Sequence, residues 1–305
     1  MQTKFSNLIE FMQVFSNDYI CREYFEKQRW NGKPVCPHCG NDKNIYKLGK
    51  AGQYKCSECY KKFTVTVGTV FEGGKAPLQK WFCAMYLITA HSKGISSLQL
   101  GKDIGVTQKT AWFMLHRIRE MLTEKNPQAL NNIVESDESF FGGKEKNKHA
   151  HKKTEGTQGG SGKAVVLGLL ERGGNIKTTQ IENREGETLL PIIAEQVTPG
   201  ATIATDELRG YSQLSKNYTH LTVNHSMGEY VNGLAHTNGV EGFWSLMKRG
   251  INGIQHSVSK KHLHRYCDEY AYRYNSRKIA DAERFVNAMQ HTEGRLTYAN
   301  LIAKA

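Results

Sequence analysis

The sequence lacks any apolar segment long enough to cross a membrane. Its longest strongly apolar run, residues 81–90, has ten residues, whereas a membrane-spanning helix needs about 20. The first residues also lack the apolar stretch and the small-residue cleavage site of a secretory signal. These absences exclude a transmembrane helix and argue against a secretory signal, and they predict a soluble, cytoplasmic protein.

Acidic side chains are few relative to basic ones. There are 29 Asp and Glu against 41 Lys and Arg, which gives a net charge of +12 at pH 7. Such an excess predicts a polyanionic partner. Hydrophobic residues make up 39% of the chain and aromatic residues 10%, so folded cores are expected and global disorder is excluded.

Composition divides the 305 residues into three parts, which indicates a multidomain protein. Residues 1–75 hold paired cysteines and short β-like stretches, residues 76–130 have helical patterns, and residues 131–305 have strand patterns followed by helical ones. Pro77 and Pro127 lie near the two boundaries, where helix breaks are expected. Within the third part, the Gly- and Lys-rich residues 144–163 predict a long exposed loop.

Four of the seven cysteines form two C-x-x-C pairs with the spacing C-x2-C-x16-C-x2-C, at Cys36, Cys39, Cys56 and Cys59. Each pair presents two thiolates to one ion, and a short hairpin between the pairs completes a tetrahedral zinc site. Unpaired structural cysteines and a thioredoxin-like redox motif are weaker alternatives, since the βαβ context of the latter is missing. The first part is therefore predicted to be a zinc ribbon with an N-terminal helix, holding structural Zn²⁺. Its function stays open, because ribbons bind DNA, RNA or protein.

The second part predicts three helices, at residues 79–91, 96–104 and 107–122. The spacing of the last two is typical of a helix-turn-helix, and an ordinary helical bundle is the alternative. The last helix carries polar and basic side chains, including His116 and Arg119. Those that we expect to contact DNA are Gln108, Lys109, Thr110 and Arg117.

The third part predicts a mixed α/β domain. Its order is three strands, a helix, a strand, a short link, a strand and a helix, which is the topology of a ribonuclease-H-like fold. The expected strands are 131–141, 163–170, 175–181, 201–205 and 218–223, and the expected helices are 185–197 and 238 to about 249.

Three carboxylates of this domain are predicted to meet. Asp137 lies within the first strand, Asp206 ends the fourth strand and Glu241 lies in the last helix. Such a set can hold two Mg²⁺ ions, which prefer oxygen ligands and support in-line attack at phosphorus. Glu135, on the same face as Asp137, and Glu138, on the other face, are the nearest substitutes for Asp137. Taken singly, such residues are more often turn caps or solvated side chains.

Lys248 follows Glu241 by seven positions and therefore lies on the same helix face. With Arg249 it provides positive charge for DNA near the carboxylates. A solvated lysine paired with an acidic neighbour is the alternative.

At these residues the sequence resembles the DDE-type insertion-sequence transposases that carry an N-terminal zinc ribbon. The resembling segments span nearly the whole chain and include CPHCG with CSEC, SDESFFGG, TDELRGY and HTNGVEGFWSLMKRG. The resemblance implies a metal-binding triad at Asp137, Asp206 and Glu241, with Lys248 as the associated lysine.

The resemblance further implies cleavage at the ends of an insertion sequence and joining of those ends to target DNA. Water frees a 3′-OH, which then attacks the target without a covalent enzyme intermediate. Mg²⁺, or Mn²⁺ in its place, would be the catalytic ion. The partners would be the terminal repeats, target DNA and at least a second copy of the chain, in association with the nucleoid. A resolvase-like nuclease and a DNA-binding regulator with an inactive nuclease domain are the competing hypotheses.

Overall fold

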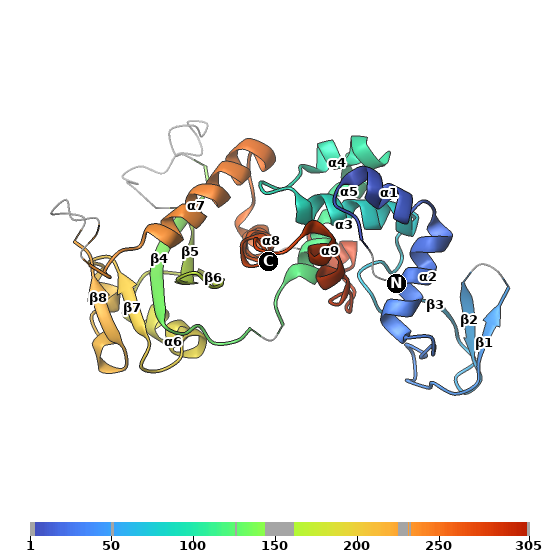
Figure 1. The fold of residues 1–305 in the computed structure, drawn as a ribbon, viewed down its shortest axis with the longest axis horizontal. Coiled ribbons are helices and arrows are strands. Elements are labelled where there is room, and N and C mark those ends of the chain that lie inside the picture. Colours follow the sequence, from blue (N-terminus) through green and yellow to red (C-terminus); the bar gives the residue numbers. More distant parts are fainter. Residues whose placement is uncertain are drawn as a thin grey trace. The chain divides into compact units, whose positions relative to one another are not determined.

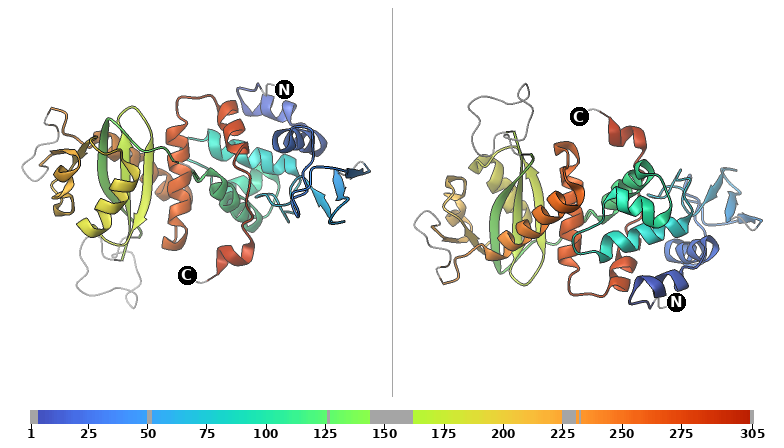
Figure 2. Two further views of the ribbon diagram at one scale, coloured as in Figure 1. Left: turned by 90° about the horizontal axis from the view of Figure 1, so that it is seen from below. Right: turned by 90° about the horizontal axis from the view of Figure 1, so that it is seen from above.

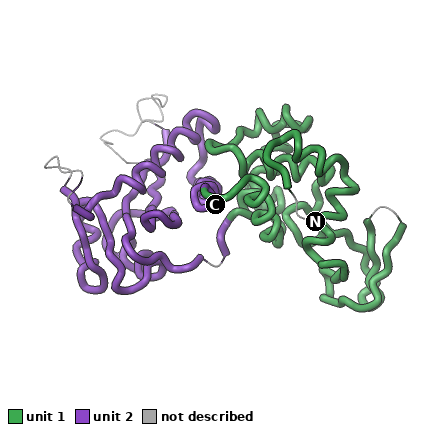
Figure 3. The backbone as a smooth tube through the Cα atoms, viewed as in Figure 1, with its two compact units in different colours: residues 1–122, 278–305 green, residues 123–277 purple. Residues whose placement is uncertain are grey.

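The computed structural model describes residues 4–49, 52–125, 127–143, 162–224, 231 and 233–303. The loop predicted at residues 144–163 therefore lies almost entirely outside the described residues. The chain forms two compact units, one of Met1–Leu122 with Lys278–Ala305 and one of Thr123–Arg277 (Figure 3). This division differs from the three predicted parts, because the first two pack together and the C-terminal residues join them. No helix in the described ranges is long and apolar enough to span a membrane.

The first unit combines a small antiparallel sheet with helices. Its sheet has the order β1-β2-β3, and the side chains of Asn7, Asn17 and Ser96 cap helices by accepting backbone N–H groups. The elements are α1 (Leu8–Val14), α2 (Asp18–Trp30), β1 (Ile45–Leu48), β2 (Gln53–Cys56), β3 (Lys62–Thr64), α3 (Leu78–Ala90), α4 (Ser97–Ile104), α5 (Gln108–Leu122), α9 (Asp281–Met289) and α10 (Tyr298–Ile302). The three helices predicted in the second part therefore lie where the sequence places them.

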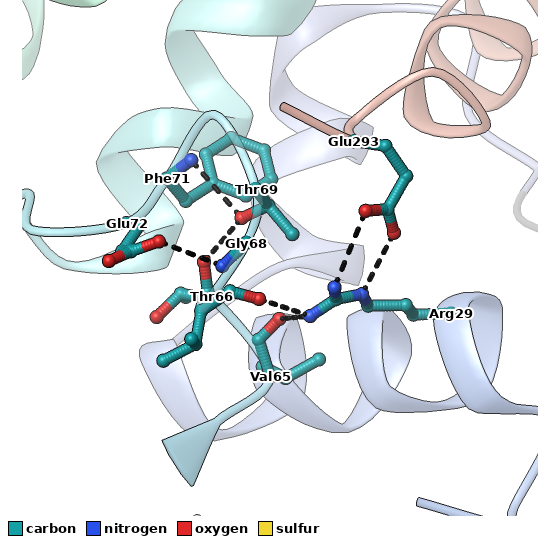
Figure 4. Close-up of polar contacts among 9 residues, drawn as sticks. Arg29, Val65, Thr66, Gly68, Thr69, Phe71, Glu72 and Glu293 are labelled. Carbon is teal, nitrogen blue, oxygen red and sulfur yellow. Dashed lines mark hydrogen bonds and ion pairs between the residues drawn. The ribbon is translucent and has the colours of Figure 1, made fainter. Parts of the chain in front are cut away.

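Residues near the C-terminus complete the core of this unit. Phe285 of α9 contacts Phe11 of α1 and Phe82 of α3, with ring centroids 5.3 and 5.6 Å apart. Arg29 of α2 donates to the carbonyls of Val65 and Val67, at 2.7 Å each, and its Nε lies 3.1 Å from Glu293 Oε1 (Figure 4). Aromatic packing and the contacts of the Arg29 guanidinium explain why Lys278–Ala305 belongs to the first unit.

The second unit is built on a mixed sheet of order β6-β5-β4-β7-β8. Strand β5 pairs antiparallel with both β4 and β6, whereas β7 pairs parallel with β4 and β8 parallel with β7. The strands are β4 (Ile133–Phe141), β5 (Ala164–Glu171), β6 (Ile176–Ile181), β7 (Thr202–Thr205) and β8 (Thr219–Thr222). The helices are α6 (Gly186–Gln196), α7 (Asn238–Gly250) and α8 (Leu263–Asn275), with short turns of helix at Arg209–Tyr211, Leu214–Lys216, Ile251–Gln255 and Lys260–His262.

Helices cover both faces of this sheet. Helix α6 packs on one face, over a core that includes Leu167 and Leu169, whereas α7 and α8 pack on the other, over Val166 and Leu170. Figure 2 shows α6 in front of the sheet in one view and α7 in front of it in the opposite view. Because successive strand residues point to opposite faces, the near-continuous apolar run of β5 supplies both cores. The expected multidomain chain with a mixed α/β domain is confirmed.

Candidate functional site

Two neighbouring strands bring Asp137 and Asp206 together. Strands β4 and β7 run parallel in a register that ends with Glu135 opposite Ala204. Two residues further along each strand, this register sets Asp137 beside Asp206, which directly follows β7. Both residues lie toward the carboxyl end of the parallel pair, where ligands of α/β sheets commonly bind.

Helix α7 lies close over β4 and β5 because two glycines leave room for it (Figure 1). A Cβ on Gly168 of β5 would stand 2.5 Å from Cζ2 of Trp244, and a Cβ on Gly239 of α7 would stand 2.7 Å from Cδ2 of Leu170. A side chain at either position would displace these neighbouring side chains or the helix. The close approach sets Glu241, in the first turn of α7, above the Asp137 face of the sheet.

A pocket of about 690 Å³ opens between β4 and α7. It brings together four predicted site residues, Asp137, Glu241, Lys248 and Arg249; the other lining residues are Glu138, Ser139, Trp244, Ser245, Asn252 and Gly253. Asp206 is not among the lining residues, although its charge acts on Asp137. Phe243 and Trp244 are buried in the core beneath.

The electrostatics of the pocket favour a cation. Burial, followed by the negative charges of Asp206 and Glu241, raises the pKa of Asp137 to about 6. The ammonium of Lys248 acts in the opposite direction and favours the carboxylate. Because ionisation of Asp137 is unfavourable in these surroundings, any further positive charge that enters the pocket stabilises its carboxylate.

Protein donors hold the other two carboxylates in place. The Thr237 hydroxyl donates to Glu241 Oε1 at 2.7 Å, and the Leu208 N–H donates to Asp206 Oδ1 at 3.0 Å. Within the described ranges, the oxygens of the three acids do not all lie within 4.8 Å of one another. Carboxylate oxygens are the ligands that Mg²⁺ prefers, and two ions about 3.5–4 Å apart use a wider set of oxygens than one ion does.

The two acids kept as substitutes for Asp137 are both bound by protein groups. Tyr211, which is fully buried, donates its hydroxyl to Glu138 and lies 2.9 Å from Ser136 Oγ. Burial raises the pKa of Glu138 to about 7. Glu135 accepts from Arg172 and from the backbone of α7. Sequence analysis did not identify Tyr211 or Arg172 as site residues, although Tyr211 is the last residue of the segment TDELRGY.

The four paired cysteines form a compact cluster in the first unit. Their sulfur atoms all lie within 4.8 Å of one another, and the distances Cys36–Cys59 and Cys39–Cys56 are both 3.6 Å. Tetrahedral zinc with Zn–S bonds of about 2.3 Å sets sulfurs about 3.8 Å apart, so the cluster fits this ion. Asn41 donates to Cys56 at 3.4 Å and lowers the pKa of that thiol to about 6, which favours the ligating thiolate.

Three of the predicted DNA contacts are exposed at the start of α5. Gln108 donates to Ser97 at 3.0 Å, Lys109 places its Nζ 5.1 Å from the ring centroid of Tyr298, and Thr110 lies beside Thr107. Their contact with DNA stays a prediction.

The prediction for Arg117 is wrong. Arg117 is only 3% exposed, and it donates to the carbonyls of Leu296, Val70 and Glu72 at 2.8, 3.0 and 2.6 Å. C-terminal residues cover this part of α5, so the guanidinium binds backbone carbonyls of other chain segments and is not available to DNA. His116 and Arg119, grouped with it on the polar side of the helix, are fully buried as well.

Comparisons with known proteins agree with this arrangement. The model of the transposase zinc-ribbon domain matches residues 16–62, which include all four cysteines, and the model of the ISXO2-like transposase domain matches residues 129–275. The chain belongs to the ISXO2-like transposase family. The matched transposase domain nearly coincides with the second unit and contains Asp137, Asp206, Glu241 and Lys248.

Relatives of this transposase-family chain carry similar names. An uncharacterized protein in transposable element ISH50 of Halobacterium salinarum is 29% identical over 86% of this chain and 92% of its own length. An uncharacterized transposase-like protein of Haemophilus influenzae is 31% identical over 34% of this chain and 84% of its own length. Among solved structures, a simian T-cell lymphotropic virus intasome in complex with PP2A regulatory subunit B56 gamma matches with 15% identity, covering 71% of this chain and 65% of that one. Its TM-score of 0.23 is too low to bear on the fold.

Proposed function

We propose that this protein cuts DNA at the ends of an insertion sequence and joins those ends to target DNA, using a ribonuclease-H-like active site. The observation that carries the proposal is the pocket in which Asp137 and Glu241 meet Lys248, with Asp206 acting on Asp137 from the neighbouring strand. Family membership indicates the class of reaction, and the pocket contains the carboxylates and the lysine that such a reaction would use.

Asp137, Asp206 and Glu241 would be the oxygen ligands of two Mg²⁺ ions, or of Mn²⁺ in their place. When bound, these ions activate the attacking oxygen and stabilise the leaving oxygen at phosphorus. Thr237 and the Leu208 N–H orient two of the three carboxylates. Lys248 and Arg249, both exposed beside the carboxylates, would hold the phosphates of the DNA strand at the pocket.

The first unit would recognise the element's ends. Helices α4 and α5 would act as a helix-turn-helix, with Gln108, Lys109 and Thr110 toward DNA and the zinc ribbon beside them. Because two ends must be joined in one event, we propose that the protein works as a homo-oligomer, at least a dimer.

The test is an assay of cleavage and joining on a supercoiled plasmid, with DNA carrying the element's ends and Mg²⁺. We expect cut and joined products from the native protein and none from Asp137→Asn, Asp206→Asn or Glu241→Gln, each of which still binds end DNA. Glu187→Gln is the matched control, since it removes an exposed acid from α6 on the other face of the sheet. Cleavage without joining would indicate a resolvase-like nuclease, and binding without cleavage would indicate a regulator.

A further inference from the structure

Glu135 is a buried carboxylate that the proposed reaction does not use. It lies two residues before Asp137 on β4, on the same face of the sheet, and is only 1% exposed. It is not among the residues that line the pocket. An ionised group taken out of water at such a position requires several donors to offset its lost hydration.

The donors come from the start of α7 and from the end of β5. Glu135 Oε2 accepts the N–H of Val240 at 3.0 Å, and Glu135 Oε1 accepts from Arg172 Nε at 2.8 Å and lies 3.2 Å from His236 Nδ1. Arg172 Nη2 also donates to the carbonyl of His236 at 2.9 Å. One carboxylate therefore joins β4, the residue after β5 and the segment that leads into α7.

This contact supplies a cap that the helix does not provide for itself. Thr237, at the N-cap position of α7, makes no side-chain capping bond, and its hydroxyl donates to Glu241. Val240 is in the first turn, where backbone N–H groups have no partner within the helix. An anion at this end of a helix is also favoured by the helix dipole.

We propose that Glu135 is a positioning residue, which anchors the first turn of α7 to β4 and so fixes the distance between Glu241 and Asp137. It is not itself a metal ligand. This inference rests on the proposed function in one respect, namely that Glu241 and Asp137 bind the same metal centre. Arg172 is part of this anchor, because it donates to both Glu135 and the carbonyl of His236.

The chemistry of the anchor predicts what substitution does. In Glu135→Gln the side chain keeps its shape, but an amide NH₂ group replaces one oxygen and faces either Arg172 or the Val240 N–H, both of which are donors. In Glu135→Asp the charge stays, but the shorter side chain reaches fewer donors. The first turn of α7 should loosen in both variants, more so in Glu135→Gln.

Mn²⁺ binding tests this without relying on DNA cleavage. Mn²⁺ is titrated into the zinc-loaded full chain, and free Mn²⁺ is measured by electron paramagnetic resonance. We expect Glu135→Gln to weaken binding by about 10–100-fold, the usual effect of losing a group that orients a ligand. Glu135→Asp and Arg172→Lys should recover part of the affinity, and Asp137→Asn should lose it entirely.

A matched control separates positioning from general destabilisation. Glu269→Gln removes another buried carboxylate of the same unit, which pairs with Arg273 within α8. It should lower the melting temperature yet leave Mn²⁺ affinity unchanged.

Two glycines of α7 give a second, independent test that keeps Glu135 intact. A Cβ at Gly239 would stand 2.8 Å from Glu135 Oε2, whereas a Cβ at Gly242 would meet nothing within 4 Å. Gly239→Ala should therefore weaken Mn²⁺ binding as Glu135→Gln does, and Gly242→Ala should not.

Two results would overturn the inference. Native Mn²⁺ affinity in folded Glu135→Gln and Gly239→Ala would show that the anchor is dispensable. Loss of Mn²⁺ binding in Glu135→Gln as complete as in Asp137→Asn, with no recovery in Glu135→Asp, would make Glu135 a ligand. Native protein that binds Mn²⁺ but cuts no DNA would refute the proposed function, while weaker Mn²⁺ binding in Glu135→Gln would still support the anchor.

Discussion

The ionised side chain of Asp137 is costly to maintain in its surroundings. Burial disfavours its ionised form, and the charges of Asp206 and Glu241 add to the penalty, which places its pKa at about 6 against an ordinary value of 3.8. Folding therefore loses stability as the pH rises from 3.8 to about 6, and the full penalty is present above that range. The unfavourable negative charge that lowers the stability of the fold also favours the binding of a divalent cation in the pocket.

Asp137→Asn should accordingly stabilise the protein when the only divalent ion is the zinc of the ribbon. We expect the free energy of unfolding at pH 8 to rise by about 1–2 kcal/mol, and the gain to fall by about half at pH 5. Urea unfolding followed by tryptophan fluorescence at both pH values measures it. Mg²⁺ should raise the stability of the native protein more than that of the variant. A variant less stable than the native protein at pH 8 would contradict the assigned pKa shift.

Lys248 should have a graded effect, since it lines the pocket but cannot replace a carboxylate ligand. Loss of a charge-assisted contact to phosphate predicts joining slowed by about 10–100-fold in Lys248→Ala. Lys248→Arg should keep part of the rate, and Mn²⁺ affinity should stay near native in both. Single-turnover joining measures the effect. A native rate of joining in Lys248→Ala would show that Lys248 is a solvated side chain without a role in joining.

At the scale of elements, α5 combines two roles along its length. Its first turn exposes Gln108, Lys109 and Thr110, whereas its later turns are buried beneath residues from the C-terminal segment. One helix is thus exposed at its start, where we propose that it contacts DNA, and is part of the core toward its end.

The two ends of α5 should respond differently to truncation. Arg117→Ala should destabilise the protein by about 3 kcal/mol, since the carbonyls of Leu296, Val70 and Glu72 lose their donor. Lys109→Ala should change stability by less than about 0.5 kcal/mol but weaken binding to end DNA. Thermal unfolding and a binding titration on both variants test this. An Arg117→Ala protein of native stability with impaired DNA binding would restore Arg117 as a DNA contact.

Local patterns in the sequence predicted most elements and the spaced motifs. Apolar alternation located the five strands of the second unit to within a few residues, and the cysteine spacing located a cluster that the structure bears out. The opposite facing of Asp137 and Glu138 followed from the two-residue repeat of a strand. These features depend on neighbours in the chain, which a single sequence displays.

Features made by distant segments were not predictable in this way. Nothing near Arg117 indicates that Leu296 will cover it, and nothing near Glu135 indicates that Val240 and Arg172 will bind its carboxylate. The same holds for Tyr211 beside Glu138. Each is a tertiary contact between residues far apart in sequence, so composition and periodicity contain no trace of it.

At the scale of the whole molecule, the chain returns at its end to the unit in which it began. Within that unit Val70 N–H donates to the carbonyl of Thr292, Arg29 contacts Glu293, and Arg117 donates to Leu296. A fragment that stops at residue 122 loses all three contacts. DNA binding by the first unit is therefore best measured on the full chain.

The net charge of +12 predicts that this binding depends steeply on salt. Released counterions should give a log–log slope of about −0.9 for each phosphate contact. A titration of end DNA and random DNA between low and moderate salt measures the slope and the preference for ends. Equal affinity at both salt concentrations, or for both DNAs, would argue against end recognition by this protein.

We propose that Asp137, Asp206 and Glu241 together hold two metal ions at the cleavage site. Anomalous scattering from Mn²⁺ in crystals of the full chain bound to end DNA tests it most directly. We expect two peaks about 3.5–4 Å apart, each within coordination distance of Asp137, Asp206 or Glu241. No peak at these residues, or peaks ligated by Glu135 or Glu138 in place of Asp137, would contradict it.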